Sequence, residues 1–274
     1  MTNRRLCILG AGNLGRALIG GLLRAGWRPE QLSVAESQSA ARDAVARDFA
    51  ITATGDNAAA VAGASIVVLA VKPQDAAAVL QPLATALAAE RPLLISVAAG
   101  VRIAALESWC GAGVPVMRAM PNRPARVGAA ATGLYAPPAV GHEPRVAAER
   151  VLQAVGDVFW VRSEELLDVV TALSGSGPAY FFLLAELMAE AGAELGLESA
   201  MAQRLAAATL YGSGLLTHAG DGDLARLREE VTSAGGTTEA ALRAFAAADL
   251  RATVRAALAA ATQRGRELAR QAAP

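Results

Sequence analysis

Several residue types are scarce in this 274-residue chain, and each scarcity excludes a class of protein. Aromatic residues make up only 4% of the chain, and Lys72 is its sole lysine. The formal net charge is zero and no basic run occurs, which argues against nucleic acid and anionic membranes as partners. We identify neither an apolar stretch approaching about eighteen residues nor a signal peptide. We therefore expect a cytoplasmic protein that does not enter a membrane.

The two cysteines, Cys7 and Cys110, have no metal-like spacing and fall in apolar surroundings. Small buried side chains are therefore expected at both positions rather than a redox pair. No metal site is expected.

The first part of the chain has the rhythm of an α/β domain. Strands are predicted at Leu6–Leu9, Leu32–Ala35, Ser65–Val71, Leu93–Val97, Val114–Arg118 and Ala130–Tyr135. Helices are predicted between them at Arg16–Ala25, Ser39–Asp48 and Gln74–Ala88. This alternation predicts a doubly wound, mostly parallel sheet of Rossmann type over residues 1–161.

Residues 162–274 predict an all-α domain. Its expected helices are Glu164–Leu173, Pro178–Leu195, Ser199–Thr217, Asp223–Val231, Thr238–Ala246 and Asp249–Arg270. Pro178–Leu195 is apolar on more than one face, and such a helix must be covered. A second subunit is the expected cover, so we predict at least a homodimer; a compact monomeric bundle is the alternative.

A glycine-rich loop follows the first predicted strand and opens a helix. The segment reads Gly10-Ala11-Gly12-Asn13-Leu14-Gly15, which matches the G-x-G-x-x-G fingerprint in its required context. Its glycines allow a tight turn, an approach to a pyrophosphate, and close packing of helix on strand. The amides at the helix start would face the phosphates. The loop therefore predicts a dinucleotide site.

Other cofactor residues are predicted where strands end. Glu36 ends the second strand, where a carboxylate accepts hydrogen bonds from a ribose 2′-hydroxyl and favours NAD over NADP. Arg42 would shift that balance if it reached the same pocket, and a solvated strand-end residue is the alternative for Glu36. Further predicted cofactor residues at strand ends are Val71, Lys72, Pro73 and Asn122, the last at the nicotinamide end.

Two hydroxyl-rich segments predict a polar pocket in the helical half. Ser174 and Gly175 belong to a turn before a long helix, where exposed amides would suit an anion. The second segment is Thr232-Ser233-Ala234-Gly235-Gly236-Thr237-Thr238, whose amides would form a nest for a carboxylate.

Strong proton donors are few in this half of the chain. It holds no lysine, one histidine (His218) and two tyrosines (Tyr180 and Tyr211). Reduction of a ketone usually needs such a donor near the carbonyl. An already activated cyclic imine fits better, because a threonine hydroxyl suffices to orient its nitrogen.

With these motifs, the chain resembles the pyrroline-5-carboxylate reductase family from about Leu6 to Leu268. The most specific stretch is Leu227–Leu242, which contains Val231–Thr238. Supporting stretches are Gly10–Leu14, Ala70–Gln74, Ile95–Gly100, Met120–Pro124 and Leu173–Phe182.

The resemblance implies NAD(P)H-dependent reduction of 1-pyrroline-5-carboxylate to L-proline by a dimer, often built into rings of five dimers. It implies that the glycine-threonine loop, with Gly235, Gly236 and Thr237, holds the substrate carboxylate and that Thr238 bonds the ring nitrogen. Ser233 is a further expected substrate-binding residue, through its hydroxyl. Asn57 and the Val71-Lys72-Pro73 loop would help to hold the nucleotide. The family more often uses NADPH, whereas Glu36 favours NADH, so either cofactor is expected to work.

This chain departs from the family pattern at two positions. Ala234 replaces a proline, which would loosen the substrate loop, and Arg123 replaces a threonine near the nicotinamide. The alternative functions are a related imine reductase, a β-hydroxyacid dehydrogenase, for which the required lysine is absent, and a non-catalytic nucleotide-sensing protein.

Overall fold

The computed structural model describes residues 5–220 and 222–271 and divides the chain into two compact units. Unit 1 comprises residues 1–176 and 261–274, and unit 2 comprises residues 177–260. The predicted division at residue 161 falls just after the last strand, whereas the units divide between residues 176 and 177, where a long helix begins, and between residues 260 and 261, inside another helix.

Unit 1 is built on one eight-stranded sheet, in the order β3-β2-β1-β4-β5-β6-β7-β8. The strands are β1 (Leu6–Leu9), β2 (Leu32–Ala35), β3 (Thr52–Thr54), β4 (Ile66–Leu69), β5 (Leu93–Ser96), β6 (Val116–Met120), β7 (Ala130–Tyr135) and β8 (Gly156–Trp160). All neighbouring pairs are parallel except β6 and β7. The doubly wound, mostly parallel sheet is therefore confirmed.

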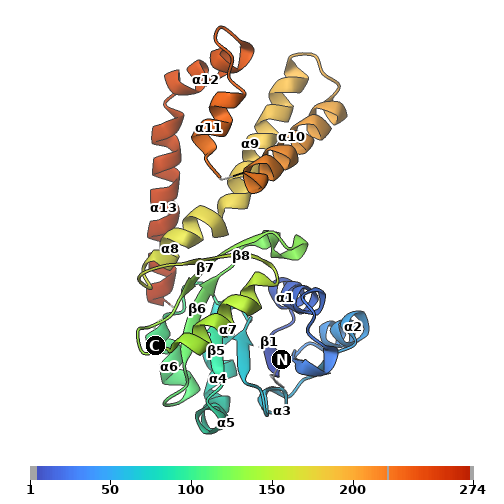
Figure 1. Cartoon of the computed structure of the whole chain (residues 1–274), viewed down its shortest axis with the longest axis vertical. Helices are drawn as coiled ribbons and strands as arrows, with labels where there is room; N and C mark the ends of the chain where they lie inside the picture. Colours follow the sequence, from blue (N-terminus) through green and yellow to red (C-terminus); the bar gives the residue numbers. More distant parts are fainter. Residues whose placement is uncertain (1–4, 221, 272–274) are drawn as a thin grey trace. The chain divides into compact units, whose positions relative to one another are not determined.

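Helices cover both faces of the sheet (Figure 1). They are α1 (Asn13–Arg24), α2 (Ser39–Phe49), α3 (Asn57–Val61), α4 (Ala76–Leu80), α5 (Ala84–Glu90), α6 (Ile103–Cys110), α7 (His142–Gln153) and α8 (Leu166–Val170). Along β1, Leu6 and Ile8 pack with α1, α2 and α7, whereas Cys7 and Leu9 pack with α3 to α6. This alternation buries the central strands on both sides, as parallel sheets require.

Short helical segments interrupt the connections. The 3₁₀ segments are η1 (Pro29–Gln31), η2 (Pro73–Asp75), η3 (Gln81–Leu83) and η4 (Arg123–Val127), and a π-helical segment, η5, spans Thr171–Gly175. The prediction of a single helix over Gln74–Ala88 was wrong, because this range is divided into η2, α4, η3 and α5. Pro82 lies in η3, between α4 and α5, because proline cannot donate the helical hydrogen bond.

Unit 2 is wholly helical within its described residues, as predicted. Its helices are α9 (Gly177–Glu194), α10 (Ser199–Ala219), α11 (Leu224–Glu230), α12 (Thr237–Ala247) and the first part of α13 (Leu250–Gln271). The helices α9 and α10 form a hairpin with an alanine contact that includes Ala189, Ala202 and Ala206 (Figure 1). Such small side chains allow two helices to approach closely.

One helical stretch corrects the expectation that no apolar segment approaches membrane-spanning length. Leu166–Glu194 is long and apolar enough to cross a membrane by length and composition, with a mean hydropathy of 1.3. Core helices of soluble proteins have the same length and composition. Many large apolar side chains of α9 are exposed in the single chain, including Phe181, Phe182, Leu183 and Leu187.

Candidate functional site

The predicted cofactor loop connects β1 to α1 in a tight turn. Gly10 has φ +103°, and its amide donates to the Ala35 carbonyl at 2.9 Å. A Cβ at Gly15 would overlap the Gly10 carbonyl oxygen, so the close approach of helix to strand requires glycine there. A Cβ at Gly12 would meet nothing within 4 Å, which leaves open space above the loop. The backbone thus has the shape of a phosphate cradle.

The start of α1 suits an anion. Gly12 is its N-cap and provides no side-chain hydrogen bond, and the first turn contains no acidic residue. The first amides of a helix lack intrahelical partners, and the helix dipole adds positive potential there. Asn13 is exposed and Leu14 half-buried, and both line a cavity against η4.

Glu36 is bound to the loop itself. Its Oε2 accepts from the Ala11 amide at 2.9 Å, and its Oε1 accepts from the Gln38 amide at 2.9 Å. Arg42 lies on the same side, and its Nη1 donates to the Glu36 carbonyl oxygen at 3.0 Å. A carboxylate and a guanidinium therefore meet at the end of β2, and the carboxylate also fixes the glycine loop.

The other predicted nucleotide residues lie at or near strand ends of the same unit. Val71 packs against Gly10, its Cγ1 lying 3.0 Å from where a Gly10 Cβ would stand. Lys72 is exposed and Pro73 begins η2, directly after β4. Asn57 is half-buried and begins α3, shortly after β3. The structure thus brings Val71 against the glycine loop, and the cofactor roles of these residues stay predictions.

Asn122 has a structural task in addition to the predicted one. Its Nδ2 donates to the Ser174 carbonyl at 3.1 Å, and its Oδ1 accepts from the Ala131 amide at 3.0 Å. The side chain thus joins the end of β6 to β7 and to η5. A contact with the nicotinamide would have to use the remaining hydrogen-bonding capacity of this amide.

Ser174 and Gly175 do not form the expected open turn. They end the π-helical segment η5, in which the Ser176 amide donates to the Thr171 carbonyl at 2.8 Å. The single Ser174 hydroxyl hydrogen is shared between the Ala131 and Val170 carbonyls, at 3.4 and 3.3 Å. The prediction of an exposed amide seat was therefore wrong, because the chain continues as helix from α8 into α9. π-helical segments are frequent at functional sites.

The predicted substrate loop lies in unit 2 and forms a tight turn before α12. The Gly236 amide donates to the Ser233 carbonyl at 3.0 Å, and Gly235 has φ +71°. Ala234 therefore takes the second position of the turn, where proline is common. A Cβ at Gly236 would overlap the Ser233 hydroxyl as it stands, so a side chain there would make Ser233 rotate.

The loop already binds a carboxylate. The Gly235 amide donates to Oε2 of Glu239 at 2.6 Å, and Glu239 lies in the first turn of α12. Thr237 is exposed and Thr238 half-buried, and the Thr238 hydroxyl has no hydrogen-bond partner within residues 222–271. The loop thus presents an anion-binding amide at Gly235 and an unpaired hydroxyl three residues later at Thr238.

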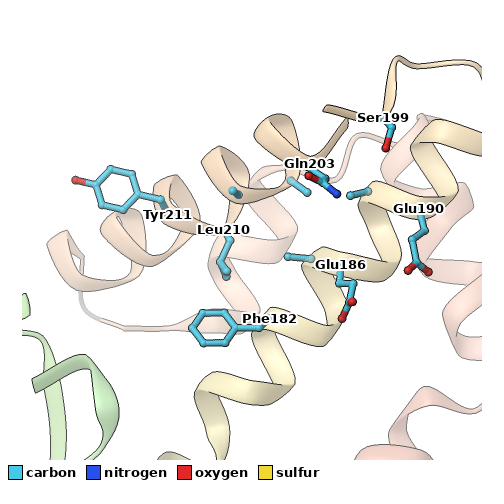
Figure 2. A pocket seen from close by; sticks show the side chains of 11 residues that line it. Phe182, Glu186, Glu190, Ser199, Gln203, Leu210 and Tyr211 are labelled. Atoms are coloured by element: carbon cyan, nitrogen blue, oxygen red, sulfur yellow. The ribbon is translucent and has the colours of Figure 1, made fainter. Parts of the chain in front are cut away.

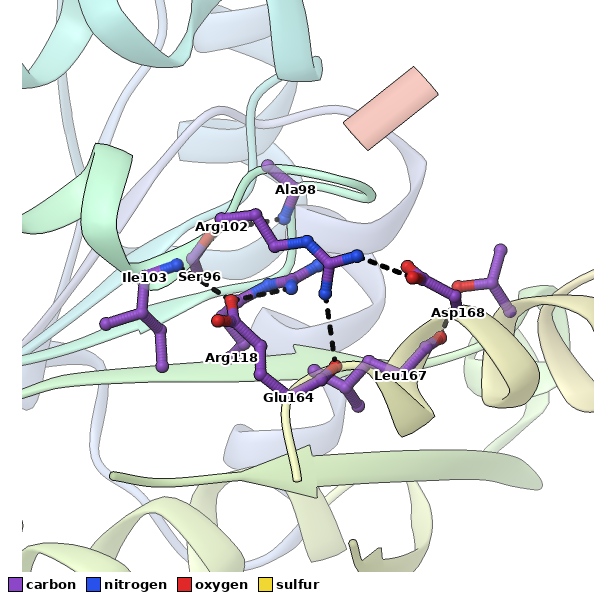
Figure 3. Close-up of polar contacts among 9 residues, drawn as sticks. Ser96, Ala98, Arg102, Ile103, Arg118, Glu164, Leu167 and Asp168 are labelled. Carbon is purple, nitrogen blue, oxygen red and sulfur yellow. Dashed lines mark hydrogen bonds and ion pairs between the residues drawn. The ribbon is translucent and has the colours of Figure 1, made fainter. Parts of the chain in front are cut away.

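A buried charge cluster, not expected from the sequence, anchors the start of α8 to the sheet (Figure 3). Arg118 on β6 pairs with Glu164 at 2.8 Å, and Arg102 pairs with Asp168. Glu164 also accepts from the Ile103 amide at 2.7 Å. Burial lowers the pKa of Arg118, opposed by its bond to Glu164. The arginines and the carboxylates are 46 and 66 positions apart in their pairs, so no local sequence pattern predicts the cluster.

A groove of about 590 Å³ runs between α9 and α10 in unit 2 (Figure 2). Phe182, Leu210 and Tyr211 line one part, and Glu186, Glu190 and Gln203 line another. No residue predicted for the cofactor or the substrate lines this groove.

Comparisons with known proteins agree with both halves of the chain. Residues 164–268 match the family model described as pyrroline-5-carboxylate reductase dimerisation, and residues 5–100 match NADP oxidoreductase coenzyme F420-dependent. The chain is 45% identical to pyrroline-5-carboxylate reductase of Pseudomonas aeruginosa, covering 99% of both chains. It is 41% identical to the enzyme of Mycobacterium tuberculosis, covering 96% of both.

Solved structures give the same result. A pyrroline-5-carboxylate reductase from Coxiella burnetii superposes with a TM-score of 0.94 at 37% identity, covering 97% of this chain and 99% of that one. The pyrroline carboxylate reductase of Plasmodium falciparum with NADP bound gives 0.82 at 26% identity, covering 98% and 99%.

Proposed function

The chain belongs to the pyrroline-5-carboxylate reductase family, and from that premise we propose roles for the two glycine-rich loops. The chain is an NAD(P)H-dependent oxidoreductase that reduces the imine 1-pyrroline-5-carboxylate to L-proline. The observation that carries this function is 45% identity over 99% of both chains. The Gly10–Gly15 loop is proposed to hold the nucleotide and the Thr232–Thr238 loop to hold the substrate.

The residues present fit a dinucleotide. The open space over Gly12, the uncapped start of α1 and the turn at Gly10 form a cradle that side chains would fill. When bound, the nicotinamide cofactor supplies the hydride. Gly10, Gly12, Asn13, Leu14 and Gly15 would hold its pyrophosphate through the backbone. Asn57, Val71, Lys72, Pro73 and Asn122 are proposed to hold its remaining parts.

The substrate loop is proposed to hold the imine by its two polar ends. The amides of Gly235, Gly236 and Thr237 bind the carboxylate, which takes the place of the Glu239 carboxylate on Gly235. The unpaired Thr238 hydroxyl orients the ring nitrogen, and the Ser233 hydroxyl at the start of the same turn is proposed to bind the substrate as well. The nitrogen of an iminium ion already carries its proton, so hydride transfer to the carbon needs no strong acid, in keeping with the lack of lysine in unit 2.

Cofactor preference is proposed to depend on Glu36 and Arg42. A 2′-phosphate at the end of β2 would be repelled by the Glu36 carboxylate and attracted by the Arg42 guanidinium, so both NADH and NADPH are accepted. Glu36→Gln is expected to raise the ratio of kcat/KM for NADPH to that for NADH about tenfold, and Arg42→Gln to lower it similarly. Equal effects on both cofactors would contradict this assignment.

The second chain of the dimer is proposed to cover the apolar face of α9 and α10, which makes a membrane span unnecessary. A homodimer is the smallest assembly, and a ring of five dimers follows from the family resemblance. A cytoplasmic location is proposed accordingly.

The purified enzyme tests the function directly. With synthetic 1-pyrroline-5-carboxylate, it should oxidise NADPH or NADH and form one L-proline for each cofactor molecule oxidised. Proline-dependent reduction of NAD and of NADP gives the reverse direction. A β-hydroxyacid dehydrogenase would reduce the cofactor with hydroxyacids instead, and a nucleotide-sensing protein would bind it with no turnover.

A further inference from the structure

Two arginines on η4 line the same small cavity as the start of α1. The cavity has a volume of about 190 Å³, and Arg123 and Arg126 form one wall of it. Asn13, Leu14 and Ala17 of α1 form the opposite wall. This volume admits a small anionic group but not a whole dinucleotide.

The backbone of η4 holds both arginines in a defined position. Ala125, which lies between them, is 1% exposed and packs in the core under α1. Asn122, immediately before η4, is bound to Ala131 and Ser174. In a 3₁₀ helix, residues three apart eclipse one another, so Arg123 and Arg126 extend from the same side.

Arg123 and Arg126 are both exposed, so their charged groups lie at the rim of this cavity. Neither arginine makes a hydrogen bond or an ion pair within residues 5–220 and 222–271. No acidic residue lines the cavity, and the first turn of α1 contains none. Glu36, the acid that binds the glycine loop, is bonded instead to the Ala11 and Gln38 amides. Two cations thus share a cavity wall with a helix N-terminus, an arrangement that an anion would neutralise.

We propose that Arg123 and Arg126 bind the pyrophosphate of the nicotinamide cofactor from the side opposite the glycine loop. This inference rests on the proposed cofactor site and deepens it, since it adds two side-chain ligands to the backbone cradle. A guanidinium presents paired donors that match phosphate oxygens, so each arginine adds charge-assisted hydrogen bonds. The 2′-position of the adenosine ribose, in contrast, is assigned to Glu36 and Arg42 at the end of β2. The two arginines therefore act equally on NAD and NADP.

Equilibrium binding to the whole enzyme tests the proposal. Arg123→Gln, Arg126→Gln and the double variant are titrated by calorimetry with NADP⁺, NAD⁺ and ADP-ribose. Each single variant is expected to raise the three Kd values by the same factor, about tenfold, the size of one charge-assisted hydrogen bond. Kd of the double variant should also depend less steeply on salt. Arg150→Gln, which removes an exposed arginine of α7, should leave Kd unchanged.

Three outcomes would overturn the proposal. Unchanged Kd values in the double variant would exclude contact with the nucleotide. A loss confined to NADP⁺ would place the arginines at the 2′-phosphate. Unchanged Kd with a raised KM for the imine would place them at the substrate carboxylate. Thermal unfolding of each variant confirms that it is folded. The titrations need no turnover, so a wild-type enzyme that bound dinucleotide but failed to reduce the imine would contradict only the proposed function.

Discussion

At the scale of single residues, Thr238 has the most consequential side chain of the substrate loop. Its hydroxyl is unpaired within residues 222–271, whereas the neighbouring Thr232 hydroxyl donates to the Arg228 carbonyl at 2.6 Å. Thr238→Ala should lower kcat/KM for the imine about 10- to 100-fold, because one hydrogen bond to a charged nitrogen is lost. Kd for NADP⁺ should not change.

Two controls separate this role from folding of the loop. Thr238→Ser keeps the hydroxyl and should recover most of the activity, whereas Thr232→Val removes a hydroxyl that bonds the backbone and should affect stability more than kcat. Normal turnover by Thr238→Ala would show that the hydroxyl does not orient the substrate.

Cys7 supports a prediction about pH. Burial in the core raises the pKa of Cys7 to about 12 and that of Cys110 to about 11. Neither thiol of the native enzyme should react with iodoacetamide at about pH 8, whereas the unfolded chain should label at both. Since the pKa of Cys7 is raised by folding, its stabilising contribution is complete below pH 9 and is lost as pH rises toward 12. Between about pH 9 and 11, wild-type unfolding midpoints should therefore fall more steeply than those of Cys7→Ala.

At the scale of elements, the buried charge cluster determines how α8 is held on the sheet. Arg118→Met would leave Glu164 without its cation in a site where the arginine side chain is only 5% exposed. Removing one partner of a buried pair costs about 3–5 kcal/mol, so the free energy of unfolding should fall by that order. Arg118→Met/Glu164→Gln should recover part of the loss. Denaturation in urea at one protein concentration measures both.

An exposed pair provides the comparison. Arg16 and Asp48 are bonded, but their side chains are 34% and 38% exposed. Arg16→Met should therefore change stability little. Equal losses from Arg16→Met and Arg118→Met would show that burial of the cluster is not what makes it stabilising.

Elements with strong periodicity were predictable from the sequence, and those decided by tertiary contacts were not. The strands Leu6–Leu9 and Leu32–Ala35 were predicted at their observed bounds because both are short apolar runs buried on two faces. The strand Thr52–Thr54 was missed, since it has three residues and is defined by its pairing with β2. The prediction of one helix through Pro82 failed because it followed the apolar periodicity of the segment and gave too little weight to the proline.

In the candidate site, too, features set by local sequence were predictable and features set by tertiary contacts were not. The glycine loop was predictable because its conformation depends on residues adjacent in sequence. The bonds of Glu36 to Ala11 and of Asn122 to Ser174 join residues 25 and 52 positions apart, and no local pattern encodes them. Arg123 was identified only as a departure from a family pattern, and its place in a cavity required the fold.

At the scale of the whole molecule, the apolar surface of unit 2 calls for a partner chain. Phe181, Phe182, Leu183 and Leu187 of α9 are each at least half exposed in the single chain. Soluble proteins rarely leave a contiguous apolar patch of this kind uncovered. The match of residues 164–268 to a dimerisation model supports the proposal that a second copy of the chain covers this face.

Leu187→Asp tests this face in solution. In a symmetric dimer each substitution occurs twice, so two carboxylates would be desolvated against apolar side chains, and dissociation is expected. Sedimentation velocity at micromolar concentration should show a shift toward the mass of a single chain, with a lower thermal midpoint that rises with protein concentration. Leu195→Asp is the matched control, because Leu195 follows α9 and is 90% exposed. If Leu187→Asp kept the wild-type mass while Leu195→Asp lost it, the interface would lie at the α9–α10 turn instead of the α9 face.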